Sequence, residues 1–177
     1  MNFARLEKNL IDNIKEAQIK LGWDNRPMSL NYMNSSLANI AGEEVNEESL
    51  AEFCRYSEKK LDKINIRPIK DGYCFTVSAK GTSYVNNLNE GYGFITELIE
   101  TVRNHCRSID DAIGVFQRYS DKIVIEEGDG EEFDKLVYFA DGIPDEYVYC
   151  LTAEPCLEGC HIAYHRFIRE DFHDIFG

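Results

Sequence analysis

The sequence predicts an α+β fold in which helices pack with a mainly antiparallel sheet. Apolar residues recur at steps of three and four through much of the first 120 positions, as in amphipathic helices. Short alternating segments flank Asp71-Gly72, a turn pair typical of hairpins, and four more such segments fill the last third of the chain. We therefore expect about five helices, a mid-chain hairpin and a C-terminal four-strand meander, all in a single domain over residues 1–177.

The first part, residues 1–63, is predicted to be helical. An apolar stripe runs from Phe3 to Leu21, and Gly22 stands where a helix-ending glycine belongs. A short helix is expected over 35–41 after an irregular stretch at 23–33. Asn46 is placed to cap a third helix that begins near Glu47.

The hairpin is predicted over residues 64–80, and Pro68 marks its first arm as an edge strand because proline cannot donate a ladder hydrogen bond. Residues 92–120 then predict two further helices, the second capped by Ser108.

The meander is predicted over residues 122–168, with strands at 122–127, 135–140, 146–152 and 160–168. Its middle strands are apolar on both sides, as in Leu136 to Phe139, whereas a sheet with one wet face alternates apolar and polar residues. Either helices cover both faces, or one face is an aromatic surface for a ligand or a second subunit.

The charge is strongly acidic, since 19 Lys and Arg against 32 Asp and Glu give a net charge of −13. Such a body repels nucleic acid and anionic membranes, so neither is expected as a partner. A basic protein, or a second copy in a homodimer, is the expected partner. The sequence has no secretory signal or membrane-spanning stretch, and its six cysteines are expected to be reduced thiols, which predicts a cytoplasmic protein.

A cluster of cysteines and histidines near the C-terminus could hold zinc. The three candidate ligands are Cys156, Cys160 and His161. His165 lies four residues beyond His161, which on a strand separates the two by about 13 Å, too far to share one ion. Because the segment after Cys160 is predicted to be extended, the zinc site is the alternative hypothesis, and no cofactor is expected.

The same segment supplies the candidate ligand-binding residues, which are Tyr164, His165, Arg166 and His161. No phosphate-binding loop, dinucleotide fingerprint or hydrolase signature occurs in the sequence. Cys160 is followed by His161, but adjacent strand residues point to opposite faces, so a nucleophilic cysteine would need a base from another strand, which the sequence does not show. The composition thus favours a non-enzymatic binding protein with an acidic, tyrosine-rich surface. A small-molecule site at the C-terminal hairpin remains open.

Several segments in order resemble an uncharacterised bacterial family, domain of unknown function 3877. They include SSLANIAG, FITELIETV, EEFDKLVYFAD and YHRFIREDF. The resemblance implies a small cytoplasmic protein of bacteria from the gut with no assigned activity, and it transfers no catalytic residue.

Overall fold

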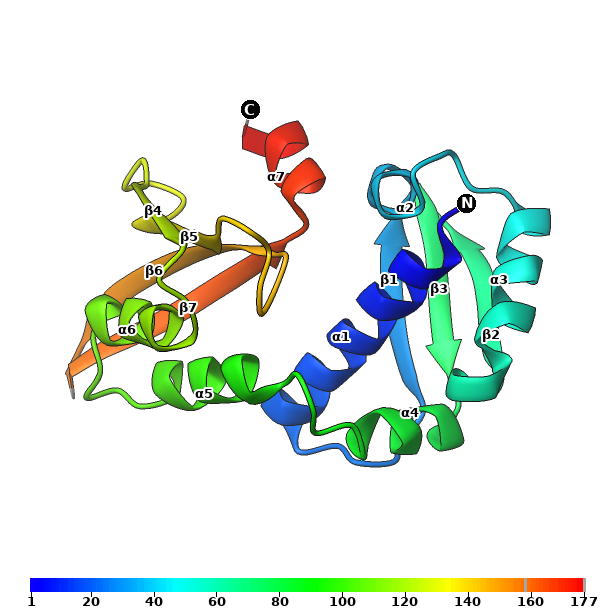
Figure 1. Ribbon diagram of the computed structural model, residues 1–177, viewed down its shortest axis with the longest axis horizontal. Helices are drawn as coiled ribbons and strands as arrows, with labels where there is room; N and C mark the ends of the chain where they lie inside the picture. Colours follow the sequence, from blue (N-terminus) through cyan, green and yellow to red (C-terminus); the bar gives the residue numbers. More distant parts are fainter. Residues whose placement is uncertain (158, 177) are drawn as a thin grey trace. The chain divides into compact units, whose positions relative to one another are not determined.

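The computed structural model describes residues 1–157 and 159–176. The chain divides into two compact units, Met1–Asn89 and Glu90–Gly177. Each unit contains helices and one antiparallel sheet, so the predicted α+β class is confirmed (Figure 1). The prediction that residues 1–177 form a single domain stays a prediction.

The first unit combines four helices with a three-stranded sheet. Its elements are α1 (Phe3–Leu21), β1 (Met28–Met33), α2 (Asn34–Ala41), α3 (Glu47–Leu61), β2 (Ile64–Ile69), β3 (Gly72–Val77) and α4 (Ala79–Asn86). The strand order is β1-β3-β2, which places β2 at an edge as Pro68 predicts. The core of the unit joins helix to sheet through aromatic rings, with Phe53 of α3 6.1 Å from Phe75 of β3 and 6.2 Å from Phe3 of α1.

The helix boundaries in this unit follow local chemistry. Gly22 ends α1 at a φ of 66°, a left-handed conformation that glycine adopts without steric cost. The side chain of Asn46 accepts the Ser49 N–H at 2.9 Å, and the Ser49 hydroxyl accepts the Asn46 N–H at 3.0 Å, so both exposed amides at the start of α3 are satisfied.

The second unit combines helices with a four-stranded antiparallel meander. Its elements are α5 (Gly93–Val102), α6 (Ile109–Tyr119), β4 (Ile123–Glu127), β5 (Lys135–Phe139), β6 (Val148–Cys156), β7 (Gly159–Phe167) and α7 (Arg169–Phe176). The strand order β4-β5-β6-β7 is the predicted meander. Ser108 caps α6, as the sequence predicts, by accepting the Asp111 N–H at 3.3 Å.

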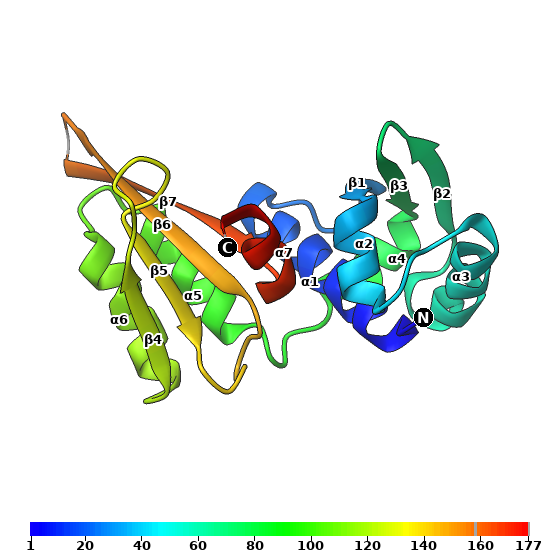
Figure 2. The ribbon, with the colours of Figure 1, turned by 90° about the horizontal axis from the view of Figure 1, so that it is seen from above.

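Both faces of this sheet carry helices, which accounts for its apolar residues on both sides (Figures 1 and 2). On one face Phe94 of α5 and Phe116 of α6 lie 5.7 and 5.2 Å from the ring of Tyr149. On the other face α7 brings Phe172 to 6.4 Å from Phe167, next to a cluster built on Leu136, Val148 and Cys150.

Two helices, α4 and α7, and one strand, β1, are additional to the elements that the sequence predicts. Helix α4 was not predicted, because Gly81 and the β-branched Thr82 and Val85 are weak helix formers. It forms because Ser78 caps it and because Gly81 approaches the Leu61 carbonyl, where a Cβ would lie 2.2 Å from the oxygen. Strand β1 occupies a stretch predicted to be irregular, and α7 follows the predicted meander.

Candidate functional site

The C-terminal hairpin of the second unit contains all of the residues that the sequence singles out. Strand β7 is extended from Gly159 to Phe167, which confirms the geometry on which the sequence argument depends. Tyr164 is buried against Tyr149, with ring centroids 5.7 Å apart. Arg166 stacks its guanidinium 4.2 Å from the centre of the Tyr147 ring, a cation–π contact. The structure therefore places Tyr164 and Arg166 among core tyrosines.

The two histidines of this hairpin lie on the opposite face from Tyr164 and Arg166, since successive residues of a strand alternate. His161 is exposed and stacks on His105, with ring centroids 5.9 Å apart. His165 is exposed and lies opposite Cys150 in the register of β6 and β7. The structure thus divides the four predicted ligand-binding residues between two faces of one sheet.

The three alternative zinc ligands do not form a common site in the described structure. Cys160 lies opposite Pro155 and Cys156 opposite Gly159, so their side chains leave the hairpin on different faces, and His161 turns away from Cys160. Across residues 1–157 and 159–176 no three His, Cys, Asp or Glu side chains converge as a metal site would require.

The acidic loop between β4 and β5 is a hairpin turn. Asp129 Oδ1 accepts the backbone N–H groups of Glu131 at 2.9 Å and Glu132 at 2.8 Å. These hydrogen bonds, that of Glu132 first, lower the pKa of Asp129, because they favour the charged carboxylate. The carboxylate of Asp129 therefore holds the loop together.

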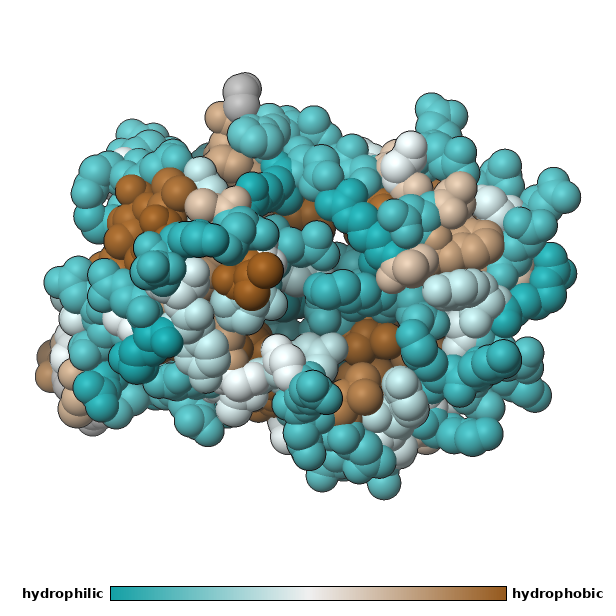
Figure 3. Space-filling model, in the orientation of Figure 1, coloured by the Kyte–Doolittle hydropathy of each residue, from teal (hydrophilic) through white to brown (hydrophobic). Residues whose placement is uncertain are grey.

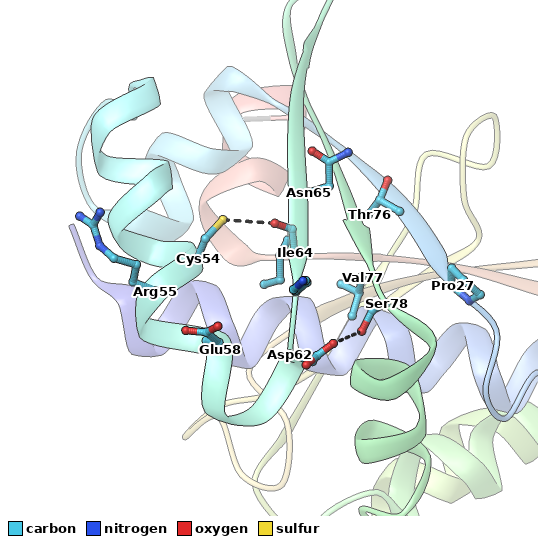
Figure 4. Close-up of a pocket in the computed structure, with 11 residues that line it drawn as sticks. Pro27, Cys54, Arg55, Glu58, Asp62, Ile64, Asn65, Thr76, Val77 and Ser78 are labelled. Carbon is cyan, nitrogen blue, oxygen red and sulfur yellow. Dashed lines mark hydrogen bonds between the residues drawn. The ribbon is translucent and has the colours of Figure 1, made fainter.

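A groove that the sequence did not predict lies in the first unit, between α3 and the edge strand β2. It contains two cavities of about 500 and 460 Å³ that both have Cys54 in their lining, and Figure 4 shows the larger one. We call this feature the α3–β2 groove. The larger cavity lies toward the C-terminal end of α3 and extends past β2 to β3. It is lined by Pro27, Cys54, Arg55, Glu58, Asp62, Lys63, Ile64, Asn65, Thr76, Val77 and Ser78. The smaller cavity lies toward the N-terminal end of α3 and is lined by Glu47, Leu50, Ala51, Cys54, Ile66, Pro68 and Tyr73.

The groove exists because α3 buries only one of its sides. Leu50, Phe53, Ser57 and Leu61 are buried, whereas Ala51 is exposed. Since α3 is amphipathic, the remaining sides of the helix stay open along β2.

Cys54 joins helix and strand at the centre of the groove. Its thiol donates to the carbonyl oxygen of Ile64 at 3.6 Å (Figure 4). Burial raises the pKa of Cys54, an effect that a hydrogen bond from its own backbone N–H partly offsets. The thiol is therefore protonated at neutral pH, a state suited to hydrogen bonding and unsuited to nucleophilic attack.

Asp62 lies at the end of the groove that holds the larger cavity, directly after the last turn of α3, and has a φ of 54°. Its carboxylate accepts the Ser78 hydroxyl at 2.9 Å and the Lys80 ammonium at 3.3 Å. The backbone N–H of Lys63, then Ser78 and then Lys80 lower the pKa of Asp62, so this end carries a fixed negative charge.

The edge of β2 presents backbone groups along the groove. The Ser78 N–H donates to the Lys63 carbonyl at 3.2 Å, so Lys63 faces β3. Because successive residues of an antiparallel strand alternate, Asn65 and Arg67 also face β3. The three residues that turn their backbone groups to the open edge are Ile64, Ile66 and Pro68. In the described part of the chain no other strand pairs with β2.

The net charge is distributed unequally between the two units. Met1–Asn89 has 12 Lys and Arg and 12 Asp and Glu, whereas Glu90–Gly177 has 7 and 20. The second unit therefore carries the whole net charge of −13.

The described residues contain no helix that combines the length and the apolar character needed to cross a bilayer. No curated protein and no solved structure matches the sequence. One family profile does match, over residues 3–176, and its description is "Domain of unknown function, E. rectale Gene description (DUF3877)". With nearly the whole chain matched, this protein belongs to the family of domain of unknown function 3877.

Proposed function

We propose that this chain is a non-enzymatic cytoplasmic binding protein whose partner is a basic protein. The observation that supports the proposal most directly is the charge of the second unit, with 20 acidic against 7 basic side chains. Complementary charge speeds encounter and suppresses like-charged competitors. A cytoplasmic location accords with six cysteines, which are typical thiols of a reducing compartment.

The acidic charge is densest at the β4–β5 hairpin. Six of the nine residues from 126 to 134 are acidic, and they are Glu126, Glu127, Asp129, Glu131, Glu132 and Asp134. All six are exposed. Beside them Ile125 of β4 is 41% exposed, and Figure 3 shows apolar residues gathered where β4 and β5 run. An apolar patch bordered by carboxylates suits a partner with basic side chains around an apolar contact.

The tyrosines contribute less to this surface than the sequence suggests. Tyr147, Tyr149 and Tyr164 are buried in the core of the second unit. Tyr119 is 40% exposed, and burial together with a hydrogen bond to Glu97 raises its pKa. The proposal therefore rests on acidic charge.

The test is capture from a native lysate of a bacterium that carries the gene, with the full chain immobilised. One variant replaces Glu126, Glu131 and Glu132 by Gln. A matched control replaces Glu44, Glu48 and Glu52 of the first unit by Gln, which changes the net charge by the same amount. We expect a basic protein to be retained by the wild type and the control, to be weakened in the hairpin variant and to elute as salt screens the charges.

Three results would contradict the proposal. The captured protein could be acidic or neutral, the two triple variants could behave alike, or binding could be insensitive to salt. Equilibrium sedimentation of the purified chain tests the other expected partner, a second copy of the chain in a homodimer.

A further inference from the structure

The α3–β2 groove has the parts of a site for an extended peptide. A helix forms one wall, a strand edge with outward-turned backbone groups forms the other, and cavities of about 460 and 500 Å³ lie between them. An extended chain that pairs with a sheet edge satisfies the edge amides and carbonyls, while every second side chain enters the groove.

Ile66 is the central contact for such a chain. Its N–H and carbonyl both face the open edge, and its side chain lines the smaller cavity. The neighbouring outward carbonyl, that of Ile64, already accepts from the Cys54 thiol, so an added strand pairs with Ile66 and with the Ile64 N–H. Pro68 has no N–H, so the outward-facing N–H donors of β2 end at Ile66.

The charged residues of α3 determine which side chains a bound peptide can place at the two ends of the groove. Glu47 stands at one end of the groove and Glu58 at the other. Two cations, Arg55 and Lys63, also line the larger cavity, and Arg55 lies 3.9 Å from Glu52 and points away from β2 in Figure 4. The centre of the wall is apolar, with Leu50 and Ala51.

The spacing of the two glutamates matches an extended chain. They are 11 positions apart on α3, which is roughly 16 Å along the helix axis. An extended chain covers a similar length, roughly 13 Å, between residues four apart, whose side chains point to the same side. An apolar side chain midway between them would then face Cys54 and Ile66.

We infer that the α3–β2 groove binds an extended segment of a partner protein as a fourth strand on β2, with Lys or Arg at its first and fifth positions and an apolar residue at its third. The inference rests on the proposed function and names the kind of segment that a basic partner would insert.

The test titrates the full chain with three acetylated and amidated heptapeptides, followed by NMR amide shifts and amide hydrogen exchange. TKTVTKT carries the inferred pattern. TETVTET reverses its charge, and TKTVKTT keeps its composition but places the two lysines three apart, so that one points out of the groove.

We expect TKTVTKT to bind at least tenfold more tightly than TETVTET and several-fold more tightly than TKTVKTT. On binding, the amides of Ile64 and Ile66 should shift and gain protection from exchange. The amides of Asn65 and Arg67 face β3 already and serve as internal references.

Three substitutions localise the effect. Ala51→Arg fills the groove from an exposed helix position and should abolish binding, since arginine is a good helix former and preserves the fold. Glu47→Gln and Glu58→Gln should each weaken binding about two- to fivefold, as expected for partly exposed ion pairs. Glu44→Gln, which removes one negative charge outside the groove, should have no effect.

The inference is overturned if no heptapeptide binds at millimolar concentration, if the three peptides bind alike, or if protection appears without the alternation between Ile64, Asn65 and Ile66. The capture assay separates the two proposals. A basic partner that still binds Ala51→Arg refutes the groove as its site and leaves the proposed function standing. Binding of TKTVTKT by the groove without capture of any basic protein refutes the proposed function alone.

Discussion

Raising the pH should destabilise this protein through a single buried thiol. Cys150 lies on β6 within the cluster covered in part by α7, and only 3% of its surface is exposed. Burial, and secondarily the negative charge of Glu132, raises the pKa of Cys150 from 9.0 to about 11. The Cys150 thiol of the folded chain therefore stays protonated at a pH where the same thiol in the unfolded chain is already ionised.

The sign and the size of the effect follow from linkage. Because the folded pKa is higher, the contribution to stability is complete below pH 9.0 and is lost as the pH rises toward about 11. A difference of about two pKa units corresponds to about 2.7 kcal/mol in all, and roughly half of that is lost by pH 10.

The assay is urea unfolding at pH 8, 9 and 10, followed by circular dichroism, for the wild type and Cys150→Ala. Both proteins share every other titrating group, including Cys54, so the difference between their unfolding free energies isolates Cys150. We expect this difference to shrink by about 1.4 kcal/mol between pH 8 and pH 10. If the unfolding free energies of both proteins fall by the same amount between pH 8 and pH 10, ionisation of Cys150 does not destabilise the folded chain.

Three substitutions test the local arguments, each by thermal unfolding. Gly128→Ala should cost about 1–3 kcal/mol of unfolding free energy, because a Cβ there would lie 1.9 Å from the Phe133 carbonyl oxygen. Gly130→Ala is the comparison, since its Cβ would have open space around it and only the backbone φ of 74° would be strained. An equal cost for both variants would contradict the steric overlap at position 128. Phe94→Ala should cost about 3–5 kcal/mol, since four aromatic rings contact it, and a loss below 1 kcal/mol would mean that the site collapses around the change. Asn46→Ala should cost about 0.5–2 kcal/mol by removing the cap of α3, whereas Asn46→Asp should retain most of the stability, and equal losses would rule out the cap as the cause.

Much of the fold could be predicted because its signals are local. The stripe from Phe3 to Leu21, the cap at Asn46 and the turn at Asp71-Gly72 each depend on neighbours within a few positions, and the structure has all three. Helix α4 escaped prediction because its stability comes from distant packing. The Leu61 carbonyl lies so close to position 81 that only glycine, a poor helix former, fits there.

The candidate site was harder to predict, for a related reason. Reactive residue types drew attention to the C-terminal hairpin, but strand alternation sends Tyr164 and His165 to opposite faces. The α3–β2 groove is built from ordinary residues such as Ala51, Cys54 and Ile66, and it exists only once a helix lies along an open strand edge. Pro68 was the one signal in the sequence, since it marked β2 as an edge.

The uneven distribution of charge has a consequence for behaviour in acid. All four histidines, at positions 105, 161, 165 and 173, lie in the second unit, but its excess of carboxylates is larger than they can offset near the isoelectric point of about 4.7. As carboxylates begin to take up protons, the balanced first unit becomes positive while the second is still negative. At zero net charge the two units then carry opposite charges, so the first unit of one molecule attracts the second unit of another. Mild acid should thus cause salt-reversible clustering of intact, folded chains.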